Sequence, residues 1–130
     1  MTLHLPFRTN SDANFLRIAA LALLAIPTAI LLLFAIGEVV GGDVSGLQHV
    51  PEAALLLGLM FFAWRHPLGT GIALLAIGSV LLVVWSALVL LGEIGGEGDS
   101  RVVVWLAAGG ILFLPPLAAG ALLLRASREL

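Results

Sequence analysis

The sequence contains no cysteine and no lysine, and only 11% of its 130 residues are charged. A chain without cysteine forms no disulfide bond, no thiolate metal site and no thiol nucleophile. The net charge of −2 also argues against a nucleic-acid partner, because nucleic acids are bound by a strongly basic face. All six basic residues are arginines, and their positions become informative below.

Motifs of common enzyme classes are also missing. The sequence has no Gly-x-Ser-x-Gly nucleophile elbow, no phosphate-binding loop and no His-Glu-x-x-His zinc motif. We therefore expect a non-enzymatic protein with no catalytic residue and no cofactor. We also expect no metal site, because His4 and His66 should lie on the opposite side of the protein from His49.

Apolar residues dominate what is present. They make up 61% of the chain, against about 45–50% in a soluble domain. The charges are segregated, which leaves uncharged windows at 18–37, 67–92 and 102–124. Each window is long enough to cross a bilayer core of about 30 Å, which takes about 20 helical residues. A soluble helix would carry a polar face. The sequence therefore predicts an all-α, integral membrane protein.

The second span is harder to place. Only the uncharged residues 53–64 separate Glu52 from Arg65, and about 18 Å of helix is too short to cross. A capping-box pattern from Ser45 to Gln48 favours a helix that begins near residue 46 and then spans. Pro51 would fall inside that helix. The alternative is an interfacial turn, with Pro51 as the first helical residue of a short tilted span.

We therefore expect one membrane domain, residues 1–130, formed by a four-helix transmembrane bundle. Its spans are predicted at about 12–40, 46–65, 68–91 and 101–125. Proline lacks a backbone N–H and clashes with the preceding turn, so we expect kinks at Pro27 and at Pro115–Pro116.

The arginines predict the orientation. The two chain ends and the turn after the second span carry most of them, and the opposite side carries only Arg101. By the positive-inside rule both termini are cytoplasmic, in the cytoplasmic membrane of a prokaryote. Trp64 would then lie at the inner interface and Trp85 and Trp105 near the outer one. Most acids would face outward.

Four of the polar residues form a candidate site. His49 and Glu52 are three residues apart and share a helical face. Glu38 and Glu93 end helices that should emerge on the same side, so the four side chains are expected to converge. Such a cluster suits a proton, a cation or a ligand, because an acid within a membrane needs a partner or a proton. The alternative is that Glu52 is an early-turn acid favoured by the helix dipole and that His49 is an interfacial polar residue.

Glycine spacing predicts close helix packing. Small residues occur at Gly37/Gly41, Gly92/Gly96, Gly69, Gly71, Gly78 and 107–110. In lipid, such residues allow the van der Waals contact that holds helices together, within one chain or between copies. The similarity of the segments 37–41 and 92–96 is explained either by duplication of a hairpin or by chance.

One resemblance extends across residues 16–72. It is carried by Gly37-Glu38, Gly41-Gly42, Ser45 to His49, Pro51, Ala63-Trp64-Arg65 and Pro67. This pattern resembles a family of small prokaryotic four-span membrane proteins of unknown function. The resemblance implies a fold and a location, and no activity.

Two functions remain open from the sequence. The first is a non-catalytic role as an accessory subunit of a larger membrane complex or as a self-associating bundle in the lipid bilayer. The loops are too short to form a soluble catalytic domain. The alternative is a small oligomeric proton or cation channel or transporter, with Glu38, His49, Glu52 and Glu93 at its outer mouth.

Overall fold

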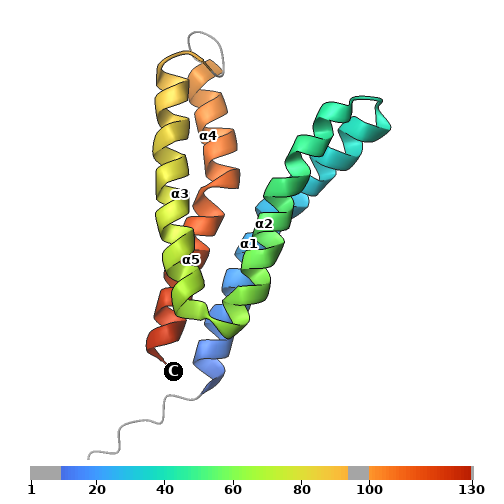
Figure 1. The fold of residues 1–130 in the computed structure, drawn as a ribbon. Coiled ribbons are helices and arrows are strands. Elements are labelled where there is room, and N and C mark those ends of the chain that lie inside the picture. The colour runs from blue at the N-terminus through green and yellow to red at the C-terminus, as the bar shows by residue number, and fades with distance from the viewer. Residues whose placement is uncertain (1–9, 94–99, 130) are drawn as a thin grey trace, which may run out of the picture.

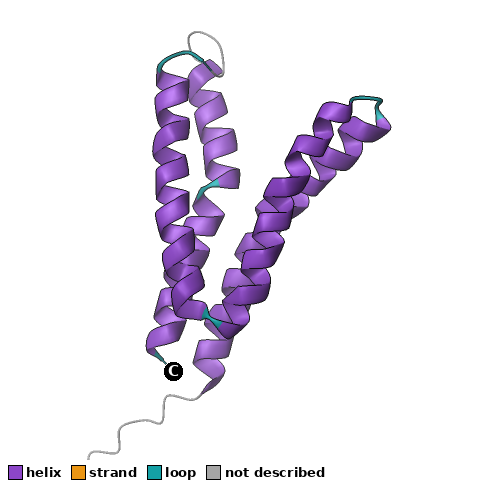
Figure 2. Cartoon of the chain, in the orientation of Figure 1, coloured by secondary structure: helices purple, strands orange, loops and turns teal. Residues whose placement is uncertain are grey.

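The fold is known from a computed structural model that describes residues 10–93 and 100–129. Within these ranges the chain is helical apart from short turns and contains no strand (Figure 2). The elements in chain order are α1 (Asn10–Val40), the short 3-10 helix η1 (Val44–Gln48), α2 (His49–Arg65), α3 (Pro67–Leu90), α4 (Ser100–Leu112) and α5 (Leu114–Arg128).

The helices form two arms that meet at one end and diverge at the other (Figure 1). The first arm consists of α1, η1 and α2, and the second of α3, α4 and α5. The most extensive packing between the arms is that of α1 on α5, and α5 also packs closely on α3. We call the end with the α2–α3 turn and the C-terminus the joined end, and the other the open end.

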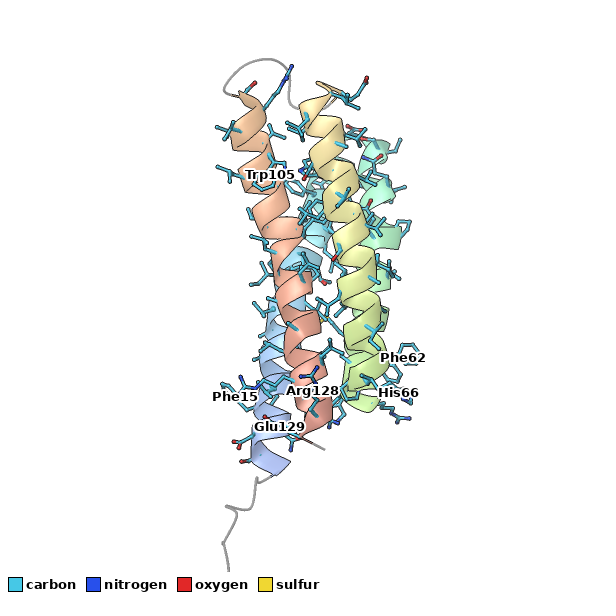
Figure 3. All side chains as sticks on the ribbon, turned by 90° about the vertical axis from the view of Figure 1, so that its left-hand side faces the viewer. Phe15, Phe62, His66, Trp105, Arg128 and Glu129 are labelled. Carbon is cyan, nitrogen blue, oxygen red and sulfur yellow. The ribbon has the colours of Figure 1, made fainter. Side chains whose placement is uncertain are left out.

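Four segments are long and apolar enough to cross a membrane: Ser11–Val40, Val44–Arg65, Pro67–Leu90 and Ser100–Arg128. The all-helical class and the four membrane-length helices are thus confirmed. The start of α1, the α2–α3 turn and the end of α5 lie together at the joined end, where Figure 3 shows Phe15, Phe62, His66, Arg128 and Glu129, with Trp105 near the open end.

The joined end is held by a small apolar core to which all four spans contribute. Its fully or nearly fully buried members are Ala20, Leu24, Ala63, Leu74, Ala119 and Leu123. Charged side chains lie around this end: the Arg17 guanidinium lies 5.4 Å from the centre of the Trp64 ring, which links α1 to α2. Arginine over an aromatic ring is attracted by the ring quadrupole.

Glycines bring α3 and α5 into close contact. A Cβ added at Gly71 would lie 2.9 Å from the carbonyl oxygen of Gly120, and one added at Gly78 would lie 2.9 Å from the Leu117 side chain. Such distances leave no room for a larger residue. Of the predicted packing positions, Gly71 and Gly78 are therefore used inside the chain, whereas Gly37 and Gly69 face open space. Gly120, which completes the contact, was not predicted.

The second span begins differently from the prediction. Its first turn is η1, and the α-helix proper starts at His49, so Pro51 lies in the first turn of α2. The predicted Ser45–Gln48 capping box is wrong. The N-cap is Asp43, whose carboxylate accepts a hydrogen bond from the Ser45 N–H at 2.9 Å. A carboxylate two residues ahead of that N–H reaches it directly, which satisfies a free donor at the helix start.

Proline shapes the last span as predicted. Pro115 and Pro116 lack N–H groups, so the carbonyls of Ile111 and Leu112 lose their usual donors. The helix is interrupted at Phe113, between α4 and α5. Pro27, in contrast, is fully buried within an unbroken α1, and its predicted kink stays a prediction.

The helix ends at the open end correspond to each other in a different register from that of the proposed repeat. Gly42 follows α1 and Gly92 follows α3, both with positive φ (90° and 79°). Each helix closes with the same pair of backbone bonds, from Gly42 and Asp43 in one arm and from Gly92 and Glu93 in the other. Gly92 therefore corresponds to Gly42, whereas the sequence comparison had aligned it with Gly37, which lies inside α1. Residues 94–96, the rest of that repeat, lie outside the described residues.

Candidate functional site

Three of the four predicted site residues come together near the open end of the first arm. The imidazole of His49 lies between two carboxylates: its Nε2 is 3.9 Å from Glu38 Oε2, and its Nδ1 is 3.6 Å from Glu52 Oε2. Glu38 is in the last turn of α1, and His49 and Glu52 are in the first turn of α2. We refer to these residues as the Glu38–His49–Glu52 group.

The tight α1–η1–α2 hairpin positions this group. Gly46, at the centre of η1, is buried against α1, where an added Cβ would lie 2.7 Å from the Cβ of Glu38. This close approach carries the start of α2 past the end of α1, so His49 can reach Glu38. The ring of Phe34 covers the imidazole from α1, with ring centres 6.1 Å apart.

Two atoms of the group are buried without a hydrogen-bond partner among the residues the structure describes. They are Oε2 of Glu38 and Nδ1 of His49. The two distances from the imidazole, 3.9 and 3.6 Å, exceed hydrogen-bond length, so neither acid is hydrogen-bonded to His49. A neutral imidazole donates from one nitrogen and accepts at the other. His49 turns a different nitrogen to each acid, which is the arrangement of groups that a proton relay between Glu38 and Glu52 would require.

Glu52 is the most exposed member of the group. Its side chain is 62% exposed, against 36% for Glu38 and 23% for His49. Its place in the first turn of α2 is one where the helix dipole favours a negative charge, so that part of the alternative interpretation also holds. The carboxylate faces a cleft between the two arms, which gives it access to a space that the other two residues lack.

Glu93 does not join the group. It follows α3 at the open end of the second arm, and the arms diverge towards that end (Figure 1). The prediction assumed a compact bundle, in which acids that end parallel helices lie close together. Hydrophobic patterning gives the direction of each span, but it does not give the angle between hairpins.

The cleft between the arms has a volume of about 440 Å³ and is bounded by all four spans. Leu74 belongs both to the apolar core and to the cleft wall, so the core forms the floor. Glu52 is the only charged side chain among the described residues that line it. The other lining residues are apolar: Pro27, Leu31, Leu55, Leu56, Leu59, Leu74, Ile77, Gly78, Leu81, Trp85, Leu112, Phe113 and Pro116.

Sequence reasoning missed the cleft and its aromatic wall. Trp85 of α3 and Phe113, at the break between α4 and α5, lie with ring centres 6.0 Å apart. We expected Trp85 to be an interfacial residue. An aromatic residue in an apolar span carries no sequence signal that separates a cleft wall from a lipid-facing position. The sequence signal near Phe113 was the Pro115–Pro116 pair, which predicts an irregular helix there.

No group of three or more His, Asp or Glu side chains in residues 10–93 and 100–129 is placed to hold a metal ion. The geometry of the Glu38–His49–Glu52 group explains this for its own members. The two acids approach opposite nitrogens of the imidazole, so one ion cannot contact all three side chains.

Neither a protein-family profile, nor a curated protein, nor a solved structure shows a significant match to the chain. The resemblance of residues 16–72 to small four-span proteins gains no support from these comparisons. Functional reasoning therefore depends on the geometry of the cleft and of the Glu38–His49–Glu52 group.

Proposed function

We propose that the chain is a non-catalytic multi-pass protein of a prokaryotic cytoplasmic membrane, with both termini on the cytoplasmic side. The four membrane-length helices and the arginines at the joined end support this orientation. The open end, with Asp43 and the Glu38–His49–Glu52 group, then faces outward.

Labelling in intact cells tests this orientation. An impermeant maleimide should label Asp43→Cys but not His66→Cys, and the label reports on these sites alone because the native chain has no cysteine.

Within that membrane, we propose that the protein is a small proton transporter. One observation carries the proposal: a carboxylate on the wall of a cleft between two helical arms is connected through an imidazole to a second carboxylate. Ionisable residues in membrane spans are costly and typically mark ion or substrate pathways. Glu52 would take up a proton or a cation from the cleft, and His49 and Glu38 would exchange protons with it.

The shape of the cleft favours a transporter over an open channel. Apolar side chains from all four spans close the joined end, and no charged side chain belongs to this core. A channel needs a continuous polar path. A transporter needs a site that opens to one side at a time, and two rocking arms provide this. The V-shaped arrangement corresponds to the outward-open form.

Purified protein in liposomes with an internal pH dye tests the proposal. The wild type should acidify the lumen when an inward proton gradient is imposed together with a potassium–valinomycin potential. Glu52→Gln should reduce the rate at least about tenfold, because amides neither bind nor release protons in this range. Glu93→Gln is the matched control, since Glu93 lies on the other arm.

Both variants must reconstitute with wild-type yield and helical circular dichroism. Absence of wild-type flux in either direction of the gradient would refute the transporter. Equal flux in the wild type and Glu52→Gln would refute the role of the Glu38–His49–Glu52 group.

The second candidate is an accessory subunit or a self-associating bundle. It is favoured by the divergence of the arms, because a cleft that spans half the bundle also suits a helix of a partner protein or of another copy. Under this proposal, purification from native membranes in mild detergent yields a stoichiometric partner or a defined oligomer. A monomer isolated alone would contradict it.

A further inference from the structure

The cleft wall combines three chemical features that rarely occur together. Its lining is almost wholly apolar, it includes the rings of Trp85 and Phe113, and it carries the single carboxylate of Glu52. The volume of about 440 Å³ lies within the range of small-molecule sites, which is about 300–1,000 Å³. Each feature restricts the chemistry of an occupant.

The carboxylate selects for positive charge. No cationic side chain occurs among the described residues that line the cleft, and the ion-pair contact of the Glu52 carboxylate within these residues is the His49 imidazole at 3.6 Å. The Glu52 side chain is 62% exposed, and Glu52 is one of the residues that line the cleft. An anion would meet this charge without any compensating group, and a neutral apolar molecule would leave it desolvated and unpaired.

The apolar walls and the aromatic rings select for an organic cation over a metal ion. Calcium and magnesium require about six oxygen ligands, and a single carboxylate does not supply them. Aromatic rings attract organic cations, whose diffuse charge is weakly hydrated. An acid on α2 and two rings on the facing arm suit a molecule with one positive charge and bulky apolar groups.

We propose that the cleft binds a hydrophobic organic monocation, with its charge next to Glu52 and its apolar groups between α2, α3 and the Phe113 break. This inference rests on the proposed function in that it names the substrate class of the same site. Entry is from the open end or from the bilayer between the arms. Glu52 then holds either the cation or a proton, so the two compete for it.

Equilibrium binding to tetraphenylphosphonium tests the proposal without requiring transport. The protein in lipid nanodiscs should bind radiolabelled tetraphenylphosphonium with one site per cleft. Tetraphenylborate has the same shape and the opposite charge. It should bind nanodiscs that contain the protein no more tightly than it binds empty nanodiscs. Glu52→Gln should weaken tetraphenylphosphonium binding at least about tenfold, since it removes the single charge that the described residues place in the cleft wall. Glu93→Gln should bind as the wild type does.

A second variant covers the case in which Glu52→Gln alters the fold. Ile77 lines the cleft on α3, and Ile77→Trp would fill the cleft from that helix. Ile77→Trp keeps Glu52 and should block the cation. If instead it binds tetraphenylphosphonium as tightly as the wild type does, the site is not this cleft.

The remaining outcomes decide against the proposal. Equal binding of tetraphenylphosphonium and tetraphenylborate, or full binding by Glu52→Gln, would indicate that lipid chains or other apolar molecules fill the cleft without selection for charge. A stable dimer that binds neither ion would indicate that a second copy occupies it. Cation binding without proton flux would support this inference and refute the proposed transporter. Proton flux without cation binding would support the transporter and refute this inference.

Discussion

His49 has a different neighbour at each ring nitrogen, and this is the residue-scale feature on which the site depends. A histidine on a helix surface normally turns one nitrogen to water. Here Phe34 and the end of α1 enclose the ring, which leaves Nδ1 buried. In the proposed transporter, the imidazole would exchange protons with Glu38 and Glu52.

Gly46 sets the spacing of this group, and Gly46→Ala tests it. The new Cβ would fall 2.7 Å from the Glu38 Cβ and 3.0 Å from the Ala35 carbonyl oxygen, so η1 must move away from α1. We expect a loss of about 1–3 kcal/mol in stability, as for other overpacked sites, and slower proton flux. Unfolding in mixed micelles measures the loss of stability, and the liposome assay measures the proton flux.

Gly58→Ala is the matched control for Gly46→Ala. It lies in α2 with nothing within 4 Å of an added Cβ, so it should be neutral or stabilising through its helix propensity. If both variants behave alike, close packing at Gly46 does not position the group.

Asp43 gives a pH-dependent prediction outside the spans. Hydrogen bonds from the Ser45 side chain and the Ser45 N–H hold the pKa of the Asp43 carboxyl below its usual value of 3.8. A folded-state pKa below the unfolded value means that the cap stabilises the turn above pH 3.8 and is lost as the pH falls through the lower pKa. The Ser45 amide NMR resonance should therefore titrate with a midpoint below 3.8.

In Asp43→Asn the same resonance should stay unchanged over that pH range, because the amide does not titrate. A midpoint above 3.8 in the wild-type protein would show that the carboxylate is not stabilised by the turn.

At the scale of the elements, the contact between α3 and α5 holds the second arm together. Because α5 also packs on α1, it joins this arm to the first one. Lipid supplies no hydrophobic drive for helix pairing, so the contact depends on how closely the backbones approach. Gly71 and Gly120 provide that approach. The interruption at Phe113 allows α5 to follow α3 and α1 while α4 stays with α3 at the open end.

Gly71→Val should therefore disrupt the joined end. A Cβ there meets the Gly120 carbonyl oxygen at 2.9 Å and the Leu124 nitrogen at 3.1 Å, both backbone atoms that cannot rotate away. We expect destabilisation of about 1–3 kcal/mol or more, measured by circular dichroism during titration from a mild detergent into dodecyl sulfate.

Gly69→Val provides the comparison. It places valine two residues earlier in α3, where nothing lies within 4 Å of an added Cβ. Similar midpoints for the two variants would show that helix propensity, and not the α3–α5 contact, dominates.

At the scale of the whole molecule, the two arms meet at one end and diverge at the other (Figure 1). Spin labels at Val40→Cys and Leu91→Cys, which are exposed at the open ends of the two arms, report the angle between them. The cysteine-free sequence makes these the only labelled sites. If the protein alternates between two forms, tetraphenylphosphonium or a change of pH should shift the measured distance distribution.

Labels at Phe62→Cys and Ala121→Cys, near the joined end, should show no such shift. An open-end distribution that stays unchanged under every condition would mean that the cleft is rigid, which favours an accessory or self-associating role over transport.

The sequence by itself determined the helical class, the four membrane-length segments and the turn at His66–Pro67, because these follow from local hydrophobicity and backbone geometry. It also placed Glu38, His49 and Glu52 near one another, since a short hairpin leaves little freedom. Only the tertiary structure decided that Glu93 lies apart, that Gly120 faces Gly71 and that Trp85 and Phe113 line a cleft with Glu52. These relations join residues distant in the chain, and they depend on the angle between two arms, which is set by side-chain packing at the joined end and has no local signature.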